Sequence, residues 1–110
     1  MTDKQFDDAF TAAGAWFVGL YSEVVLANIE KLNDDREFKK QFIQSIYSKG
    51  NGPDKNETGT NVRVNSLMRI INSRRIIEAL EKIIDSSRVK KDFPEAVIEA
   101  NKLLEKLCTN

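Results

Sequence analysis

The chain contains no histidine and only one cysteine. Histidine is the commonest general base and metal ligand, and a nucleophilic serine or cysteine usually depends on one. A single cysteine can build neither an internal disulfide nor a zinc site. Gly50-Asn51-Gly52 lacks the lysine and the spacing of a phosphate-binding loop. We therefore expect a protein that is not an enzyme and that uses no metal and no cofactor.

An enzyme that uses only acidic and basic side chains stays possible. Glu78, Glu81 and Lys82 have the residue types of an acid–lysine nuclease set, but that chemistry normally lies on a sheet. Consecutive carboxylates such as Asp7-Asp8 can hold Mg²⁺, although at a helix start they more often act as caps. A small enzyme stays the third alternative, behind two kinds of binding protein.

The cysteine and the apolar segments bear on location. Cys108 lies on the apolar side of the last expected helix, so we expect it to be buried. A lone cysteine suits a reducing compartment, and Met1–Lys4 lacks the basic stretch of a secretion signal. Residues 9–29 carry only Glu23 as a charge, yet glycines and polar residues interrupt them and no basic residues flank them. We expect a buried helix there, no membrane segment, and a cytoplasmic protein.

Helix-breaking residues are also scarce. Two prolines and five glycines leave room for long helices, and the apolar residues recur with helical spacing without the alternation of a strand. We expect a single all-α domain over residues 1–110, an antiparallel bundle of roughly four or five helices. The expected helices span about 2–32, 35–49, 61–72, 74–87 and 93–108. The polar segment 50–60 is expected to be the one mobile loop.

Short motifs mark the expected helix boundaries. Thr2–Gln5 has the pattern of a capping box, and Asp34–Glu37 offers a second one. The apolar face changes direction at Asn72–Arg75. Either the helix breaks there, with Asn72 or Ser73 capping a new one, or it runs through and is buried by different partners at its two ends. Asp92–Glu95 is expected to begin the last helix, since proline is accepted in a first turn.

The first expected helix carries an apolar stripe in alternating steps of four and three residues. Such a stripe lies along a partner helix at a shallow angle. Further apolar residues between positions 15 and 29 imply contacts from a second direction. Two interpretations stay open, since the stripe is either buried within the chain or forms the seam of a homodimer. The candidate seam consists of Phe6, Phe10, Phe17, Leu20 and Val24.

The segment Thr58–Ile77 contains no Asp or Glu, although the chain as a whole has 17 acidic and 17 basic residues. We call this segment the basic segment. Its arginines and asparagines are the donors that contact phosphates, base edges and carboxylates. The candidate binding residues are Arg63, Asn65, Arg69, Asn72, Arg74 and Arg75.

Two interpretations of the basic segment stay open. Residues 1–37 hold eight acids and three bases, so the arginines could pair internally with the acidic first helix. Otherwise they form a surface for a partner. We expect a non-catalytic assembly or adaptor protein that docks a macromolecular partner, either another protein or a second copy of itself. The alternative is a nucleic-acid-binding accessory subunit, although no aromatic residue interleaves the segment to stack on bases.

Overall fold

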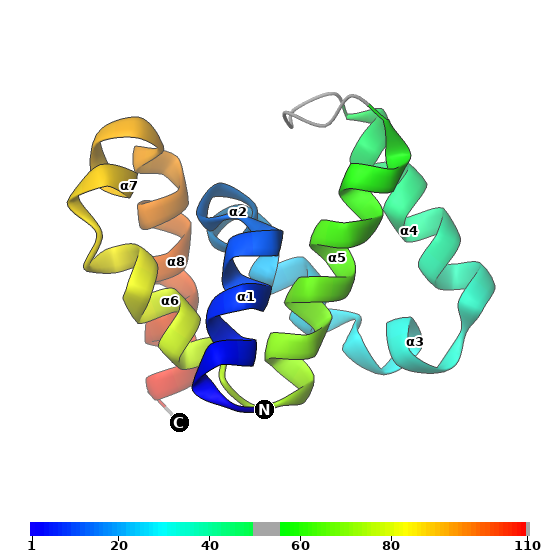
Figure 1. Cartoon of the computed structure of the whole chain (residues 1–110), viewed down its shortest axis with the longest axis horizontal. Coiled ribbons are helices and arrows are strands. Elements are labelled where there is room, and N and C mark those ends of the chain that lie inside the picture. Colours follow the sequence, from blue (N-terminus) through cyan, green and yellow to red (C-terminus); the bar gives the residue numbers. More distant parts are fainter. Residues whose placement is uncertain (50–55, 110) are drawn as a thin grey trace.

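The computed structural model describes residues 1–49 and 56–109, which form eight helices and no strand (Figure 1). The all-α class is confirmed, whereas the expected four or five helices in an antiparallel bundle are not. The helices are α1 Asp3–Ala13, α2 Ala15–Ala27, α3 Ile29–Asp34, α4 Arg36–Ser48, α5 Glu57–Asn72, α6 Ile76–Ile84, α7 Ser87–Asp92 and α8 Pro94–Cys108.

The long first helix that we expected is wrong, because the chain bends at Gly14. The capping box is present: the Thr2 hydroxyl accepts from the Gln5 amide at 3.1 Å, and the Gln5 side chain accepts from the Thr2 amide at 2.9 Å. At the other end of α1, Gly14 has a φ of 86°, which side-chain-bearing residues rarely adopt. As a result α1 and α2 meet at 94°.

This bend redistributes the apolar stripe. Phe17 is 1% exposed and Phe6 is also buried, whereas Phe10 and Leu20 are half-buried and Val24 is 40% exposed. A second break follows at Asn28, which is the N-cap of α3. The predicted stripe requires one straight helix. Because the chain bends at Gly14 and breaks at Asn28, the residues of the stripe do not lie along one straight seam. Burial of Phe17 is confirmed, and self-association remains a prediction.

The core lies where α5 and α6 meet α2 and α8. Each of these helices contributes residues without solvent exposure, among them Val64 and Ile70 of α5 and Leu80 of α6. The packing of α2 against α8 depends on Gly19, because a Cβ there would lie 2.7 Å from the Ala96 Cβ. Figure 1 shows α5 in the middle of the molecule, with α1 on one side and the α3–α4 pair on the other.

The start of α4 differs by one residue from the expected capping box. Asp35 is the N-cap and accepts from the Phe38 amide at 3.0 Å, while Asp34 still belongs to α3. At its other end α4 stops at Ser48 with Lys49 as C-cap, one residue short of the expected end, and residue 50 lies outside the described part of the chain.

The start of α5 corrects the expected loop. Asn56 caps the helix by accepting from the Gly59 amide at 3.3 Å, so residues 57–60 are helical. The loop prediction depended on the absence of a large apolar residue from segment 50–60, but the first turn of α5 needs no such residue. The remainder of the expected loop, residues 50–55, lies outside the described part of the chain.

The chain does break between α5 and α6, as one of the two interpretations expected. Arg74 takes a φ of 61° in the turn, and α6 begins after Arg75. Neither Asn72 nor Ser73 caps the new helix, because Arg75 occupies the N-cap position without a side-chain hydrogen bond.

The C-terminal region holds two further corrections. Residues 87–92 form the separate helix α7, capped by Ser86, so α8 begins at Pro94 with Phe93 rather than Asp92 before it. Cys108 is exposed and not buried, because the buried positions of α8 end at Leu103.

Membrane-spanning potential is limited to one bent pair. No individual helix within 1–49 and 56–109 has both the length and the apolarity for a span; α1 and α2 meet these criteria only when taken together.

Candidate functional site

The structure places the six predicted residues of the basic segment in different environments. Arg63, Asn65, Arg69 and Asn72 belong to α5, Arg74 lies in the turn, and Arg75 precedes α6. Because they lie on different sides of α5 or beyond its end, they do not form one surface.

Arg75 binds the acidic N-terminal region. Its Nη2 lies 3.0 Å from Asp3 Oδ1 and 2.7 Å from Glu78 Oε2, and its Nη1 donates to the Thr2 carbonyl at 3.3 Å. The guanidinium carbon lies 4.4 Å from the centroid of the Phe6 ring, within cation–π range. The Arg75 side chain is only 17% exposed. Arg75 therefore joins α6 to the start of α1.

These contacts also change the acid–base properties of the pair. The hydrogen bond that Arg75 donates to Glu78 is the main cause that raises the pKa of Arg75; burial opposes this rise, and the hydrogen bond that Arg75 donates to Asp3 adds to it. The hydrogen bond from Arg75 lowers the pKa of Glu78 below the usual range of a glutamate. Both shifts favour the charged forms, as expected for a salt bridge. For Arg75, internal pairing is the interpretation that agrees with the structure.

Arg63 lies at the bend between α1 and α2. Its Nη1 donates to the Ala13 carbonyl at 2.7 Å, and a Cβ on Gly14 would lie 2.5 Å from the same nitrogen. The side chain thus stabilises the end of α1, where carbonyl groups lack intrahelical partners.

The two predicted asparagines tie α5 to the α3–α4 pair. Asn72 and Asn33 form a reciprocal amide pair with N···O distances of 3.0 and 2.9 Å. Asn65 accepts from the Lys39 ammonium and donates to the Asn61 side chain at 2.8 Å.

Arg69 shares this face of α5, since it lies four residues after Asn65 and three before Asn72. It is exposed, and so is Arg74 beyond the helix end.

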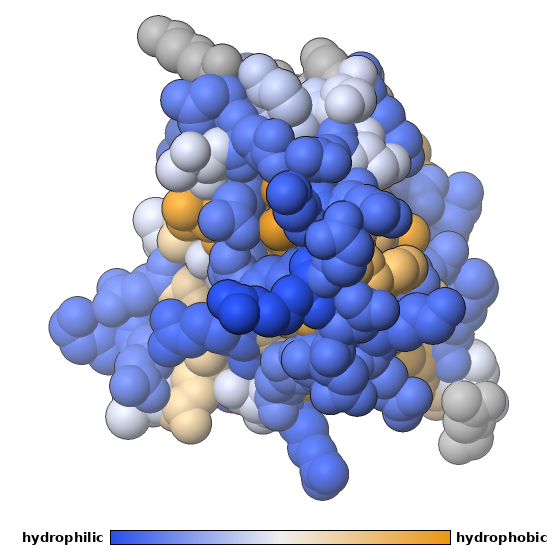
Figure 2. All heavy atoms as spheres, turned by 90° about the vertical axis from the view of Figure 1, so that its right-hand side faces the viewer, coloured by the Kyte–Doolittle hydropathy of each residue, from blue (hydrophilic) through white to orange (hydrophobic). Residues whose placement is uncertain are grey.

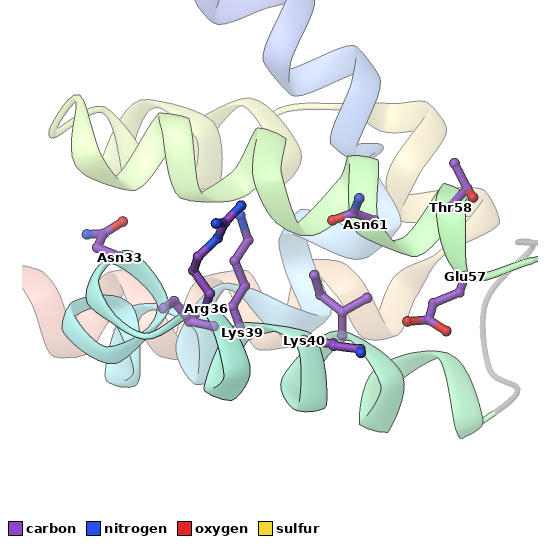
Figure 3. Close-up of a pocket in the computed structure, with 9 residues that line it drawn as sticks. Asn33, Arg36, Lys39, Lys40, Glu57, Thr58 and Asn61 are labelled. Carbon is purple, nitrogen blue, oxygen red and sulfur yellow. The ribbon is translucent and has the colours of Figure 1, made fainter.

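A cleft of about 550 Å³ lies between α4 and α5, and we call it the α4–α5 cleft. Figure 3 shows Arg36 and Lys39 extending from α4 toward α5, with Asn61 on the opposite wall and Glu57 near one end. The lining residues are Leu32, Asn33, Arg36, Lys39, Lys40, Ile43, Glu57, Thr58 and Asn61.

The cleft has excess positive charge. Over residues 1–49 and 56–109, no carboxylate lies within ion-pair distance of Arg36, Lys40 or Arg69. Glu57 is the acidic residue among its lining side chains. The adjoining face, made by α3 and α4, is largely hydrophilic (Figure 2). The cleft is therefore suited to an anionic group.

The α4 cations were missed as site residues. Arg36, Lys39 and Lys40 have i, i+3, i+4 spacing, which places them on neighbouring positions of a helix. Nearby Asp34, Asp35 and Glu37 conceal this cluster in a count along the sequence. Only the packing of α4 on α5 separates the cluster from those acids and brings it to Asn61.

Metal-ligating groups do not gather in the described ranges: no three His, Cys, Asp or Glu side chains there are placed to hold an ion.

Comparison with known proteins gives no relative from which a function could be transferred. No protein-family model matches the chain, and neither a curated protein nor a solved structure matches it.

Proposed function

We propose that the protein is a non-catalytic helical binding module, an assembly or adaptor protein that docks an acidic surface of a macromolecular partner in the α4–α5 cleft. The observation that carries this proposal is the cationic wall of Arg36, Lys39 and Lys40 opposite the amide of Asn61. Arginine and lysine bind carboxylates by charge-assisted hydrogen bonds, which are shorter and stronger than neutral ones.

The shape and charge of the cleft favour a protein as the partner. Lys39 is already bound to Asn65, so the wall has a defined geometry before binding. Leu32 and Ile43 add apolar surface at its base, which suits a carboxylate side chain and its neighbouring apolar residues. Glu57 at one end would repel a continuous phosphate backbone.

A nucleic-acid-binding accessory subunit is the second candidate. Asn61, Asn65 and Arg69 lie at helical spacing along α5, and amides with arginine are donors that nucleic acids accept. The chain as a whole is electrically neutral at pH 7, so any such binding would depend on the local charge alone.

A binding experiment separates the two candidates. An acidic peptide and a duplex DNA, each labelled, are titrated with the protein at several salt concentrations, with fluorescence anisotropy as the readout. We expect the peptide to bind more tightly than the DNA. Tighter DNA binding, with a log–log salt slope near −0.9 per phosphate contacted, would instead support the accessory subunit.

Charge reversal then tests the location. The variant Arg36→Glu/Lys40→Glu should abolish peptide binding, because it reverses two charges that line the cleft, and both residues are exposed. Arg88→Glu/Lys90→Glu makes the same charge change on α7 and should leave peptide binding intact. Equal losses in both variants would show that net charge, not the cleft, binds the peptide. Arg75 is unsuitable for this test because it holds α1 to α6.

A further inference from the structure

Helix α2 has apolar residues on all of its sides. Its 13 residues include a single charge, that of Glu23. A helix that is hydrophobic all round is normally covered all round. Val18, Ser22 and Val25 face the core with no solvent exposure. The side of α2 opposite to them is therefore the one whose exposure has to be explained.

This opposite side is apolar and accessible. At about 100° per residue, Trp16, Leu20, Val24 and Ala27 lie on the side of α2 away from its buried residues. Trp16 and Leu20 are half-buried, Val24 is 40% exposed and Ala27 is exposed. We call these four residues the outer face of α2. Such a face on a helix is suited to cover by another molecule.

The outer face of α2 is arranged symmetrically about Leu20. Trp16 lies four residues before Leu20, and Val24 lies four residues after it. If two copies of α2 packed antiparallel about a two-fold axis at Leu20, the large Trp16 of each copy would lie against the smaller Val24 of the other. Large and small side chains interdigitate well in this way, and an isologous contact uses one surface twice. This pattern favours a second copy of the chain as the partner.

The charges beside the outer face also suit a second copy. A groove between α2 and α8 is lined by Glu23, Glu99, Lys102, Glu105 and Lys106. The Lys106 ammonium lies 3.0 Å from the Glu23 carboxylate, and that of Lys102 lies 3.4 Å from Glu99. Because the groove carries both signs, a second copy can present bases to its acids and acids to its bases.

The groove also adds to the contact area. At 1.5 Å per residue, Trp16 and Ala27 lie about 17 Å apart along the helix, whereas stable interfaces bury about 1,200 Å² or more. One pair of helix faces of this length needs a flank to reach that area. Glu23 lies four residues before Ala27, so the groove adjoins the outer face and supplies this flank.

We propose that the protein forms a homodimer in which the α2 helices of two copies pack antiparallel, with Leu20 at the two-fold axis. The outer faces form the apolar centre of the interface, and the charged groove of each copy lies at its rim, the usual arrangement of such contacts. The α4–α5 cleft takes no part, so the dimer holds or fails separately from the docking function.

Two readouts test the dimer. Sedimentation equilibrium measures the mass over a range of concentrations, and we expect a rise from the 12.5 kDa of one chain toward twice that value. Trp16 is the one tryptophan of the chain, so its emission should move to shorter wavelength over the same range as water leaves the ring. A chain that stays monomeric at every concentration, or a dimer with unchanged Trp16 emission, would overturn the proposal.

Cysteine cross-linking tests the geometry, in chains where serine replaces the exposed Cys108. Across an antiparallel axis at Leu20 the two residues at position 20 meet, whereas the two at position 24 lie about 12 Å apart along the helices, too far for a disulfide. Leu20→Cys should therefore form a disulfide-linked dimer under mild oxidation, and the matched variant Val24→Cys should not. Cross-linking of both variants, or of neither while circular dichroism shows folded helices, would contradict the arrangement.

A membrane is the alternative occupant of the outer face, since tryptophan and leucine also enter a bilayer. Three acids and two lysines line the adjoining groove, and this balance does not favour an anionic lipid surface. Flotation with vesicles of neutral and anionic phospholipids checks the point. We expect the chain to stay in the aqueous fraction, and flotation of a monomeric chain would assign the outer face to lipid and overturn the dimer.

Discussion

At the scale of single residues, the arginines of the basic segment have different environments. Arg75 lies against the residues that begin α1, and its guanidinium contacts two carboxylates and the Phe6 ring. Arg74, its neighbour, is exposed in the turn. Adjacent residues of one type can therefore have separate roles, and substitutions must be chosen accordingly.

We predict that Arg75→Met lowers the urea midpoint of unfolding, whereas Arg74→Met leaves it unchanged. Methionine retains the length of the arginine side chain but removes the hydrogen bonds to Asp3, Glu78 and the Thr2 carbonyl. Equilibrium unfolding followed by circular dichroism measures both variants. Equal midpoints for the two would mean that the contacts of Arg75 contribute nothing.

The Arg75–Glu78 pair also predicts a pH dependence. The pKa of Glu78 is lowered in the folded state, so the unfolded chain binds a proton first and stability falls on acidification. The contribution is present above the ordinary glutamate pKa of about 4.3 and is lost as the pH falls through the lower folded value. Arg75 stays charged throughout this range.

Glu78→Gln isolates this contribution. Its urea midpoint should lie below that of the parent protein at neutral pH, and the difference should disappear in strongly acidic solution. The variant Glu99→Gln is a control for general charge effects, since Glu99 is exposed and pairs with Lys102, three residues away. A difference for Glu78→Gln that persists at every pH would contradict the assignment.

At the scale of helices, close contact between α2 and α8 depends on a missing side chain. Gly19 is buried, and a Cβ there would lie 2.7 Å from both the Cβ and the carbonyl oxygen of Ala96. The low helix propensity of this glycine is therefore offset by the close approach of α8.

We predict that Gly19→Ala destabilises the protein by about 1–3 kcal/mol, the usual cost of overpacking. The double variant Gly19→Ala/Ala96→Gly should recover part of this loss, because the Ala96 Cβ is removed but its carbonyl remains. Urea denaturation compares the three proteins. Alanine is the better helix former by about 1 kcal/mol, so a more stable Gly19→Ala would show that the helices do not meet so closely.

Phe17 tests the packing at the centre of the fold. Its ring is 1% exposed and stacks on Tyr21 with centroids 4.7 Å apart. Phe17→Ala should cost about 3–5 kcal/mol, the range for buried aromatic residues. Phe93→Ala, at an exposed ring, is the matched control and should cost much less. A loss below about 1 kcal/mol for Phe17→Ala would mean that the ring is poorly packed.

At the scale of the whole molecule, the bend at Gly14 limits how two copies could associate through the candidate seam. The bend at Gly14 turns α1 away from α2 by 94°, so Phe6 and Phe10 cannot continue the line of Leu20 and Val24. Val24 is 40% exposed and is the part of the candidate seam that is most accessible to a second copy.

We predict that any homodimer formed through the seam uses Val24 and dissociates in Val24→Asp. A charge on an exposed apolar position opposes burial at an interface and leaves the monomer stable. Sedimentation equilibrium over a range of concentrations measures the mass, and Val62→Asp on α5 is the control at another exposed valine. A dimer that survives Val24→Asp would exclude the seam as its interface.

The helical class, the first capping box and the burial of Phe17 could be predicted from the chain before its structure was known. These depend on local spacing and on contacts within a few residues, which are read directly from the chain. The short breaks between consecutive helices were harder to predict. In the sequence Gly14 looks like any helical glycine; the bend depends on Arg63, which donates to the carbonyl of Ala13, 50 positions earlier in the chain.

Which charges are paired inside the molecule and which lie exposed depends on the tertiary structure. Arg75 is paired internally because the start of α1 lies against it. Arg36, Lys39 and Lys40 line one cleft because α4 packs on α5. Side chains far apart in the sequence make these contacts. Electrostatic energy depends on distance in space, so no count of charges along the chain could separate an internal pair from a binding surface.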